Sequence, residues 1–347
     1  MIARRFLLVL LSLMLFAGLA LLPACGGDEE PAPVEPAPVE EEEEAAAPEI
    51  DEVAEILRLS DEYLSSEFSQ NWVVNAADVH ELVFEEGDDS FQIIDVRESA
   101  DYAAGHIEGA INIPYDSIVD DQELAKLDST KTQLLVDYDG SRATGVVLVY
   151  SQLGYDAMFL RFGMSGWTTD PAIVGAEIWD GVGGDYPVTT EGFTAEPQFD
   201  LPVLDTGAAD AREAVINATK AFLARGGNRN LLTASEINDM VQAGEDFTFL
   251  TAVSPEHYEV GHPEGAINMG RAALPQEDSI RKIDPDNKVV VTCYQGHNSG
   301  LMQMLLGQLG YDIWSMHYGM GAWTNDADVR AVPTYNPANV PNFPTVN

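Results

Sequence analysis

The stretch GHIEGAIN at residues 105–112 returns as GHPEGAIN at residues 261–268, which is 156 positions further along the chain. Two more stretches repeat at the same offset: QLGYD at 152–156 and 308–312, and FGMSGWT at 162–168, which returns as YGMGAWT at 318–324. An alignment of residues 104–170 with 260–326 needs no gap, and 21 of its 67 positions are identical. The chain therefore contains a duplication.

The repeated stretches enclose a short segment that differs between the two copies. It reads DYDGSR at residues 137–142 in the first copy and CYQGHN at residues 293–298 in the second. Asp137 thus stands at the position that Cys293 occupies in the second copy. This difference directs the search for chemistry to the second copy.

The length of the chain also indicates two domains. One hydrophobic core serves up to about 250–300 residues, and this chain has 347. We expect a first domain at residues 51–188, a connection at 189–206 that contains two prolines, and a second domain at 207–347. The tail from Val332 onward holds four prolines, and we expect it to lie extended along the second domain.

The N-terminus has the layout of a secretory signal. Arg4 and Arg5 precede an apolar run that ends in LPACGG at residues 22–27, which resembles a bacterial lipobox. We expect residues 1–24 to be a signal peptide and Cys25 to be the lipidated residue, although an uncleaved membrane anchor is an alternative. The protein would then be exported and anchored to the outer face of the cytoplasmic membrane or to the outer membrane, facing the periplasm or the exterior.

Residues 25–50 are rich in Pro and Glu, with five consecutive glutamates at 40–44, and are expected to form an extended acidic tether. The whole chain has 58 acidic and 17 basic residues, a formal charge of −41. A charge of this sign excludes nucleic acid as a partner. It also repels an anionic substrate, unless the binding site is locally positive.

Apolar residues three and four apart predict an amphipathic helix at the start of each domain, over residues 51–68 and 208–225. A second helix is predicted in each, over 76–84 with Asn75 as N-cap and over 234–243 with Thr233 as N-cap. Apolar strands are predicted at 91–96, 133–137, 247–253 and 289–292. This alternation predicts α/β domains, each with a mostly parallel sheet flanked by helices on both faces.

Cys293 directly follows the strand 289–292, and a helix is predicted over 299–309, ended by Gly310. The thiol is thus expected at the carboxyl end of a strand, where open α/β sheets place their ligand sites. A glycine-containing turn there points backbone N–H groups into one concavity, which favours a thiolate or a persulfide. Cys25 is the only other cysteine, so lipidation would leave Cys293 free; a buried, inert cysteine is the alternative.

These features resemble the rhodanese family, in the arrangement of its tandem sulfurtransferases. The stretch from DVRE at 95–98 to GHIEGAIN is similar to the family's N-terminal signature. The loop CYQGHNS at 293–299 resembles the six-residue active-site loop, and GYD followed by GMxxW resembles the closing strand and helix. In tandem members the C-terminal domain carries the catalytic cysteine and the N-terminal domain often has aspartate there, which implies Cys293 as the catalytic residue.

By this resemblance, Cys293 would accept a sulfane sulfur from a donor such as thiosulfate or a mercapto acid, hold it as a persulfide, and pass it to cyanide or a thiol. The substrate-binding residues implied are Tyr294, Gln295, Gly296, His297, Asn298 and Ser299. Backbone amides would surround the sulfur, and His297 and Asn298 could add side-chain donors, with an exposed turn as the alternative role of His297. Tyr294 is expected to form a wall, because Tyr138 occupies the same position in the copy without a thiol.

The loop departs from the family's pattern, because it has no Arg or Lys beside the cysteine or at its end. It is neutral unless His297 is protonated, which favours an organic persulfide or a mercapto acid over thiosulfate as donor. The second copy also reads TAV at 251–253, where the first has DVR. The alternative to an enzyme is a non-catalytic rhodanese-like module that binds or senses a sulfur compound or a protein thiol.

Asp137 is expected to accept the amides of its own loop, with Arg142 as its charged partner, so that the first copy is locked and inactive. The alternative is a site for a small cation or a protein partner. A cysteine phosphatase is excluded, because its longer loop ends in arginine, whereas Ser299 stands here. We expect no cofactor, and the six histidines show no metal-ligand spacing.

Overall fold

The structure is a computed structural model that describes residues 50–175, 179–227 and 230–347. The expected signal peptide, Cys25 and the acidic tether lie outside the described residues. The described residues form one compact unit. None of the helices in the described ranges is long and apolar enough to cross a membrane.

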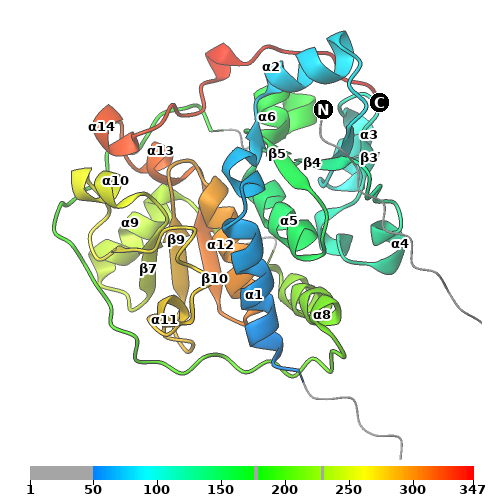
Figure 1. Cartoon of the computed structure of the whole chain (residues 1–347). Coiled ribbons are helices and arrows are strands. Elements are labelled where there is room, and N and C mark those ends of the chain that lie inside the picture. The colour runs from blue at the N-terminus through cyan, green and yellow to red at the C-terminus, as the bar shows by residue number, and fades with distance from the viewer. Residues whose placement is uncertain (1–49, 176–178, 228–229) are drawn as a thin grey trace, which may run out of the picture. The chain divides into compact units, whose positions relative to one another are not determined.

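Two five-stranded sheets form the centres of the two halves, and every strand pair in them is parallel (Figure 1). The first has the order β1 (Val73–Val74), β5 (Ala157–Leu160), β4 (Thr132–Val136), β2 (Phe91–Asp95), β3 (Ile111–Asn112). The second repeats this order with β6 (Leu231–Leu232), β10 (Ile313–Met316), β9 (Val289–Thr292), β7 (Thr248–Thr251), β8 (Ile267–Asn268). The predicted duplication and fold class are confirmed.

The helices cover both faces of each sheet. In the first half they are α1 (Glu52–Leu64), α2 (Ala76–Val79), α3 (Ser99–Ala104), α4 (Asp121–Leu124), α5 (Ser141–Gln152), α6 (Gly163–Trp167) and α7 (Pro171–Val174). In the second they are α8 (Ala211–Ala224), α9 (Ala234–Ala243), α10 (Pro255–Val260), α11 (Glu277–Ile280), α12 (His297–Gln308), α13 (Gly319–Trp323) and α14 (Ala327–Arg330). The predicted helix over 76–84 is α2 continued by a π-helical turn, His80–Glu85, and α12 begins two residues before the predicted start.

Alternate residues of each strand point to opposite faces of its sheet. In the first sheet Ile94 and Leu135 belong to the cluster that includes α1 and α5, whereas Ile93 and Leu134 pack with α2, α6 and α7. The second sheet has the same division, with Val289 on one face and Val290 on the other. Burial on both faces explains why these strands read as continuous apolar runs rather than as an alternating pattern.

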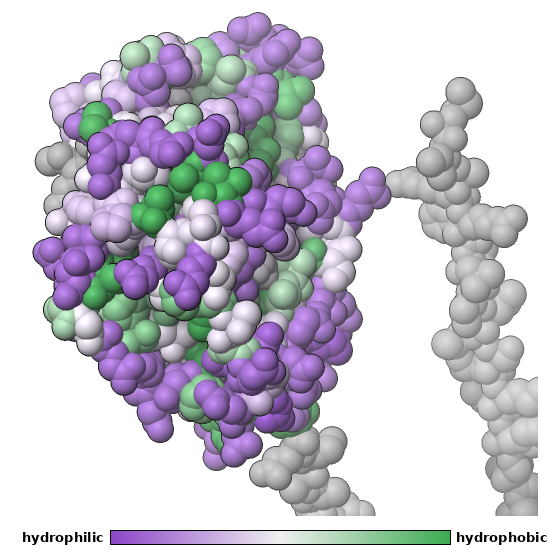
Figure 2. All heavy atoms as spheres, turned by 90° about the vertical axis from the view of Figure 1, so that its left-hand side faces the viewer, coloured by the Kyte–Doolittle hydropathy of each residue, from purple (hydrophilic) through white to green (hydrophobic). Residues whose placement is uncertain are grey.

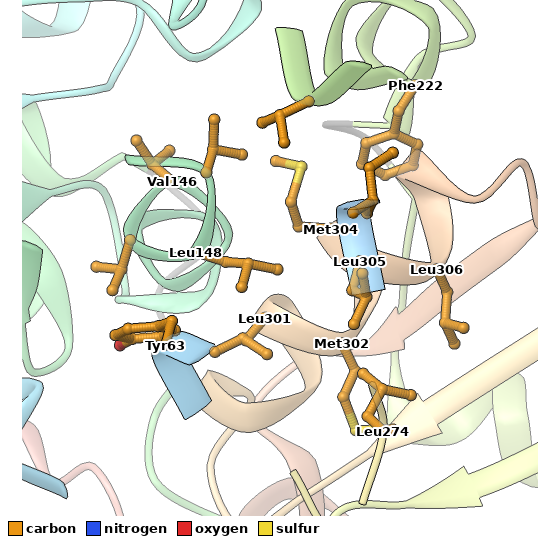
Figure 3. Packing of buried hydrophobic residues seen from close by; sticks show 14 of the residues in the cluster. Tyr63, Val146, Leu148, Phe222, Leu274, Leu301, Met302, Met304, Leu305 and Leu306 are labelled. Carbon is orange, nitrogen blue, oxygen red and sulfur yellow. The ribbon is translucent and has the colours of Figure 1, made fainter. Parts of the chain in front are cut away.

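The two halves share one hydrophobic core, built around α5 and α12. Figure 3 shows Val146 and Leu148 of α5 facing Leu301 and Met304 of α12, with Phe222 of α8 beside them. These side chains are almost completely buried. The face drawn in Figure 2 is mostly hydrophilic, in agreement with the acidic composition.

The segment that follows each half packs on the other half, so the predicted course of the C-terminal tail is wrong. Residues 332–347 run along the first half, where Trp167 Nε1 donates to Pro344 O (3.0 Å) and Val346 pairs with His106. Residues 179–189 run along the second half, where Trp323 Nε1 donates to Pro187 O (2.9 Å). The tail binds the first half because Phe343 covers the aromatic rings of His80 and Trp167.

Candidate active site

Cys293 lies where β9 ends and α12 begins. Its Sγ accepts a hydrogen bond from the backbone N–H of Gly296 (3.2 Å) and contacts Ser299 Oγ (3.7 Å). The side chain is almost completely buried, with 1% of its surface exposed. Gly296 has φ +93°, a conformation in which glycine is favoured.

The other loop residues surround the thiol, but most of their side chains already have protein partners. The hydroxyl of Tyr294 accepts the N–H of Ser254 (2.8 Å) and contacts His257 Nδ1 (2.7 Å), which agrees with a wall. Asn298 Nδ2 donates to Ala252 O (3.2 Å), and Ser299 Oγ donates to Gly296 O (2.9 Å). Asn298 therefore already uses one of the two N–H donors of its side-chain amide within the chain.

His297 reaches across to the first half. Its Nε2 contacts the backbone carbonyl of Asp139 (3.3 Å), and its ring packs against Phe159 and Phe162. Burial, and to a smaller extent the nearby Arg161, lowers the pKa of His297 to about 4, against the opposing effect of Asp139. His297 is thus neutral at physiological pH and is neither an exposed turn residue nor a cation in the loop.

Gln295 differs from the other loop residues. Its side chain is only 5% exposed, and neither its Oε1 nor its Nε2 has a hydrogen-bond partner in the part of the chain that the structure describes. A buried amide without partners is costly in a folded protein. This side chain is therefore available to a ligand.

The first copy of the loop holds the Asp137 carboxylate in an amide cradle. Asp137 Oδ1 accepts the N–H of Gly140 (2.5 Å), and Oδ2 accepts those of Arg142 (2.8 Å) and Ala143 (3.0 Å). Burial and the nearby Asp139 raise the pKa of Asp137 to about 7. The equivalent amides in the second copy belong to Gly296, Asn298 and Ser299.

The side chain of Arg142 does not have the role we expected. Its guanidinium lies over the ring of Tyr138, 5.7 Å from the centroid, and makes no ion pair with Asp137 within the described residues. Only its backbone N–H binds the carboxylate. The ion pair is dispensable because three amides already satisfy both carboxylate oxygens.

A charged contact between the halves closes the first cradle. Asp139, in the same loop as Asp137, forms an ion pair with His317 Nε2 and accepts the N–H (2.9 Å) and hydroxyl (2.6 Å) of Ser141. Burial opposes the ionisation of Asp139, but the charge and hydrogen bond of His317 lower its pKa well below the usual range. The first cradle is thus satisfied by side chains of the chain itself.

A cavity of about 210 Å³ lies beside Cys293, and both halves contribute to it. The second half contributes Cys293, Tyr294, Gln295, His297, Asn298 and Val332. The first half contributes Trp72, Val73, Phe159 and Arg161. These four residues could not be found from either copy of the sequence by itself, because they belong to the other half. Arg161 directly follows β5 and occupies the position equivalent to His317.

The DVR stretch of the first half forms a buried ion pair, in which Arg97 Nη2 lies 2.7 Å from Asp95 Oδ2. In the second half Thr251 and Val253 stand at these positions, and Thr251 Oγ1 is buried with no hydrogen-bond partner among the described residues. The fold is the same in both halves, so this pair is not needed to form it. Within the described ranges, no three His, Cys, Asp or Glu side chains are grouped so that they could hold a metal ion.

Comparison with known proteins gives two matches to one family. Residues 75–170 and again residues 233–326 match the Rhodanese-like domain, and together they make up more than half of the chain. Among solved structures, the chain is similar to a rhodanese-related protein from Thermoplasma volcanium, with 27% identity over 26% of this chain and 85% of that chain, and a TM-score of 0.24. It is also similar to a rhodanese-like domain protein from Staphylococcus aureus, with 25% identity over 30% of this chain and 92% of that chain, and a TM-score of 0.25.

Proposed function

This chain belongs to the rhodanese-like domain family, and from that premise we propose that it is a sulfurtransferase which carries sulfane sulfur on Cys293. The observation that carries the proposal is the position of the thiol, between the end of β9 and the first turn of α12, with a backbone N–H on its sulfur. Unpaired N–H groups at a helix N-terminus stabilise an anion. The thiolate and the persulfide are both anions, so one cradle serves the whole cycle.

The cradle of Asp137 supports this proposal from within the same molecule. The amides of Arg142 and Ala143 bind Oδ2 of the carboxylate there. The carboxylate stands for a group one atom longer than a cysteine thiolate, and a persulfide has that extra atom. We therefore assign the amides of Asn298 and Ser299 to the outer sulfur of a Cys293 persulfide.

Transfer then takes two displacements at sulfur. The Cys293 thiolate attacks the sulfane sulfur of the donor, forms an S–S bond, and releases the rest of the donor with the electron pair of the broken bond: sulfite from thiosulfate, or pyruvate from 3-mercaptopyruvate after the thiol proton moves to carbon. Cyanide or a thiolate then attacks the outer sulfur, and the thiolate of Cys293 leaves. The products are thiocyanate or a new persulfide, and charge is conserved in both steps.

The near-complete burial of Cys293 favours a second candidate, a non-catalytic module that binds or senses a sulfur compound or a protein thiol. Such a module would use the same cradle for recognition. It would not retain the sulfur covalently. The two candidates therefore differ in one measurable property, the mass of the protein after exposure to a donor.

The test is the intact mass of the purified protein after incubation with thiosulfate or 3-mercaptopyruvate. We expect a gain of one sulfur atom, which cyanide removes as thiocyanate and which Cys293→Ser abolishes. Arg142→Gln is the matched control, because it changes only the loop without a thiol and should keep the gain. If no donor adds sulfur to the wild-type protein, the sulfurtransferase proposal fails and the binding module remains.

The proposal also includes a location. On the sequence alone, we propose that Cys25 carries lipid and anchors the protein outside the cytoplasmic membrane, with residues 25–50 as the tether. A membrane fraction that loses the protein on Cys25→Ser supports this location. Recovery of both forms in the same fraction contradicts it.

A further inference from the structure

Equivalent residues of the two halves meet at the centre of the molecule. Gln152 Nε2 donates to Gln308 Oε1 (3.1 Å), and Gln308 Nε2 donates to Gln152 Oε1 (2.9 Å). These glutamines are 156 positions apart and end α5 and α12, which pack against each other (Figure 1). A reciprocal contact between equivalent residues is the signature of a twofold relation. Each residue in a contact that crosses between the halves therefore has an equivalent residue, 156 positions away, to compare it with.

In the first cradle, this cross-contact is the ion pair of Asp139 with His317. Asp139 belongs to the loop, and His317 directly follows β10 of the other half. Shifted by 156 positions, the pair becomes Gln295 of the Cys293 loop and Arg161, which directly follows β5 of the first half. The two equivalent positions thus hold the ion pair of Asp139 with His317 in the first cradle, and Gln295 with Arg161 in the second.

Neither of those two side chains has a charged partner like that of its counterpart. Both polar atoms of Gln295 are buried without a partner in the described part of the chain. Arg161 donates Nη2 to Pro333 O (3.2 Å) and lies over Phe162, and it forms no ion pair with any residue that the structure describes. Because the chain carries a charge of −41, a partly buried guanidinium that has no carboxylate partner and lines a cavity suits an external anion.

The cavity between these side chains can hold a small organic molecule. Arg161 and Gln295 line it together with Cys293, and Trp72 and Phe159 form apolar walls. Thiosulfate has no apolar part that would cover those walls, whereas a short organic acid has one. A guanidinium and an amide N–H together match the two oxygens of a carboxylate.

We infer that Arg161 of the first half and Gln295 of the second bind the carboxylate of a small organic acid in the cavity beside Cys293. The ion pair of Asp139 with His317 is the equivalent contact in the first cradle, where a side chain of the protein supplies the carboxylate. That the acid is the sulfur donor rests on the function proposed above; that a carboxylate binds there does not. The first half then supplies the positive charge that the Cys293 loop lacks.

The test uses pyruvate, which has the carboxylate but no sulfur to transfer, titrated calorimetrically into the Cys293→Ser protein. We expect Arg161→Gln to weaken pyruvate binding about tenfold or more, which corresponds to about 1.4 kcal/mol, and Arg161→Lys to restore part of it. Arg212→Gln is the matched control, because that guanidinium also donates to a single backbone carbonyl, Leu153 O, outside the cavity. An unchanged affinity in Arg161→Gln, or no pyruvate binding at millimolar concentration, overturns the inference.

Kinetics then separate this inference from the proposed function. With 3-mercaptopyruvate as donor, Arg161→Gln should raise KM about tenfold and change kcat less, since the contact lies away from the sulfur. If Arg161 governs pyruvate binding but Cys293 never gains sulfur, the carboxylate site stands and the sulfurtransferase proposal fails. If Cys293 gains sulfur equally well in Arg161→Gln at low donor concentration, the enzyme stands and the carboxylate site fails.

Discussion

The two cradles have equivalent backbones, but the polar side chains of the first have partners within the chain, whereas those of the second do not all have one. Around Asp137, three amides bind a built-in carboxylate, and Asp139 pairs with His317 from the other half. Around Cys293, one amide reaches the sulfur, and Gln295 and Arg161 stand where the closed pair would be. The difference teaches that the two cradles differ in two places, at the residue held by the amides and at the contact with the other half. Replacing Asp137 by cysteine would therefore change only one of them.

The largest effect is expected where α12 of one half touches α5 of the other. A Cβ on Gly300 would lie 1.9 Å from the carbonyl oxygen of Ser141, which is backbone and cannot move aside. We expect Gly300→Ala to lower the free energy of unfolding by more than about 3 kcal/mol, because the two helices must separate. Chemical denaturation measures this loss.

Gly145 provides the matched control for Gly300, since it lies in the same contact on the α5 side. A Cβ there would lie 3.2 Å from Met304 Cβ and 3.3 Å from the carbonyl oxygen of Gly300, distances that a shift of a few tenths of an ångström relieves. Gly145→Ala should therefore cost clearly less. Equal losses in the two variants would show that the helices do not approach as closely at Gly300 as described.

A smaller effect is expected from His297, the residue of the Cys293 loop that contacts the other cradle. Its pKa is about 4 in the folded protein and about 6.5 when unfolded, so between these values only the unfolded state binds the proton. Stability is therefore lost as pH falls from about 6.5 to 4, by at most about 3 kcal/mol. Over the same range the raised pKa of Asp137 acts in the opposite direction, because only its folded form stays protonated.

The comparison of wild type with His297→Gln isolates the histidine from Asp137. Denaturation at pH 7 and at pH 4.5 should give a smaller acid-induced loss in the variant than in the wild type. The same loss in both proteins would mean that His297 is protonated in the folded state. In that case it would supply the cation that the loop otherwise lacks.

The smallest effect is expected from a comparison of His317, which forms an ion pair, with Arg161, which stands at the equivalent position. His317→Ala leaves the Asp139 carboxylate partly buried without its cation, and we expect a loss of about 2 kcal/mol. Arg161→Gln, at the equivalent position, breaks no ion pair and should cost less than about 1 kcal/mol. Thermal unfolding of the two variants at pH 7 measures the difference, and an equal loss would remove the contrast between the two cradles.

Much of the fold could be predicted, because it rests on local patterns. The repeats fixed the number of domains, the apolar runs marked β9 and the other central strands, and the capping residues Asn75 and Thr233 begin α2 and α9 as predicted. Helix ends were less accurate, as in α1, because amphipathic spacing continues past the last hydrogen-bonded turn. The course of the tail was wrong, since which half it covers depends on aromatic contacts between residues that lie far apart in the chain, such as Phe343 and His80.

The position of Cys293 in its loop could also be predicted, because strand, turn and helix follow one another in sequence. Arg161, Trp72 and Phe159 could not be found in this way. They reach the thiol only because α5 and α12 pack together and bring the strand ends of one half against the loop of the other. The sequence shows that Arg161 and His317 are equivalent positions, 156 residues apart. It does not show that each of them lies against the loop of the other half.

The sequence by itself thus determined two rhodanese-like domains, one free thiol among the residues after Cys25, and the contrast of Asp137 with Cys293. These properties depend on neighbouring residues and on repeats. Local hydrogen bonding and hydrophobic periodicity are enough to determine the structure that such residues form. The tertiary structure alone decided that the first cradle is closed by His317 and that the second opens to Arg161. Both contacts join residues more than 130 positions apart, which the packing of the shared core brings together.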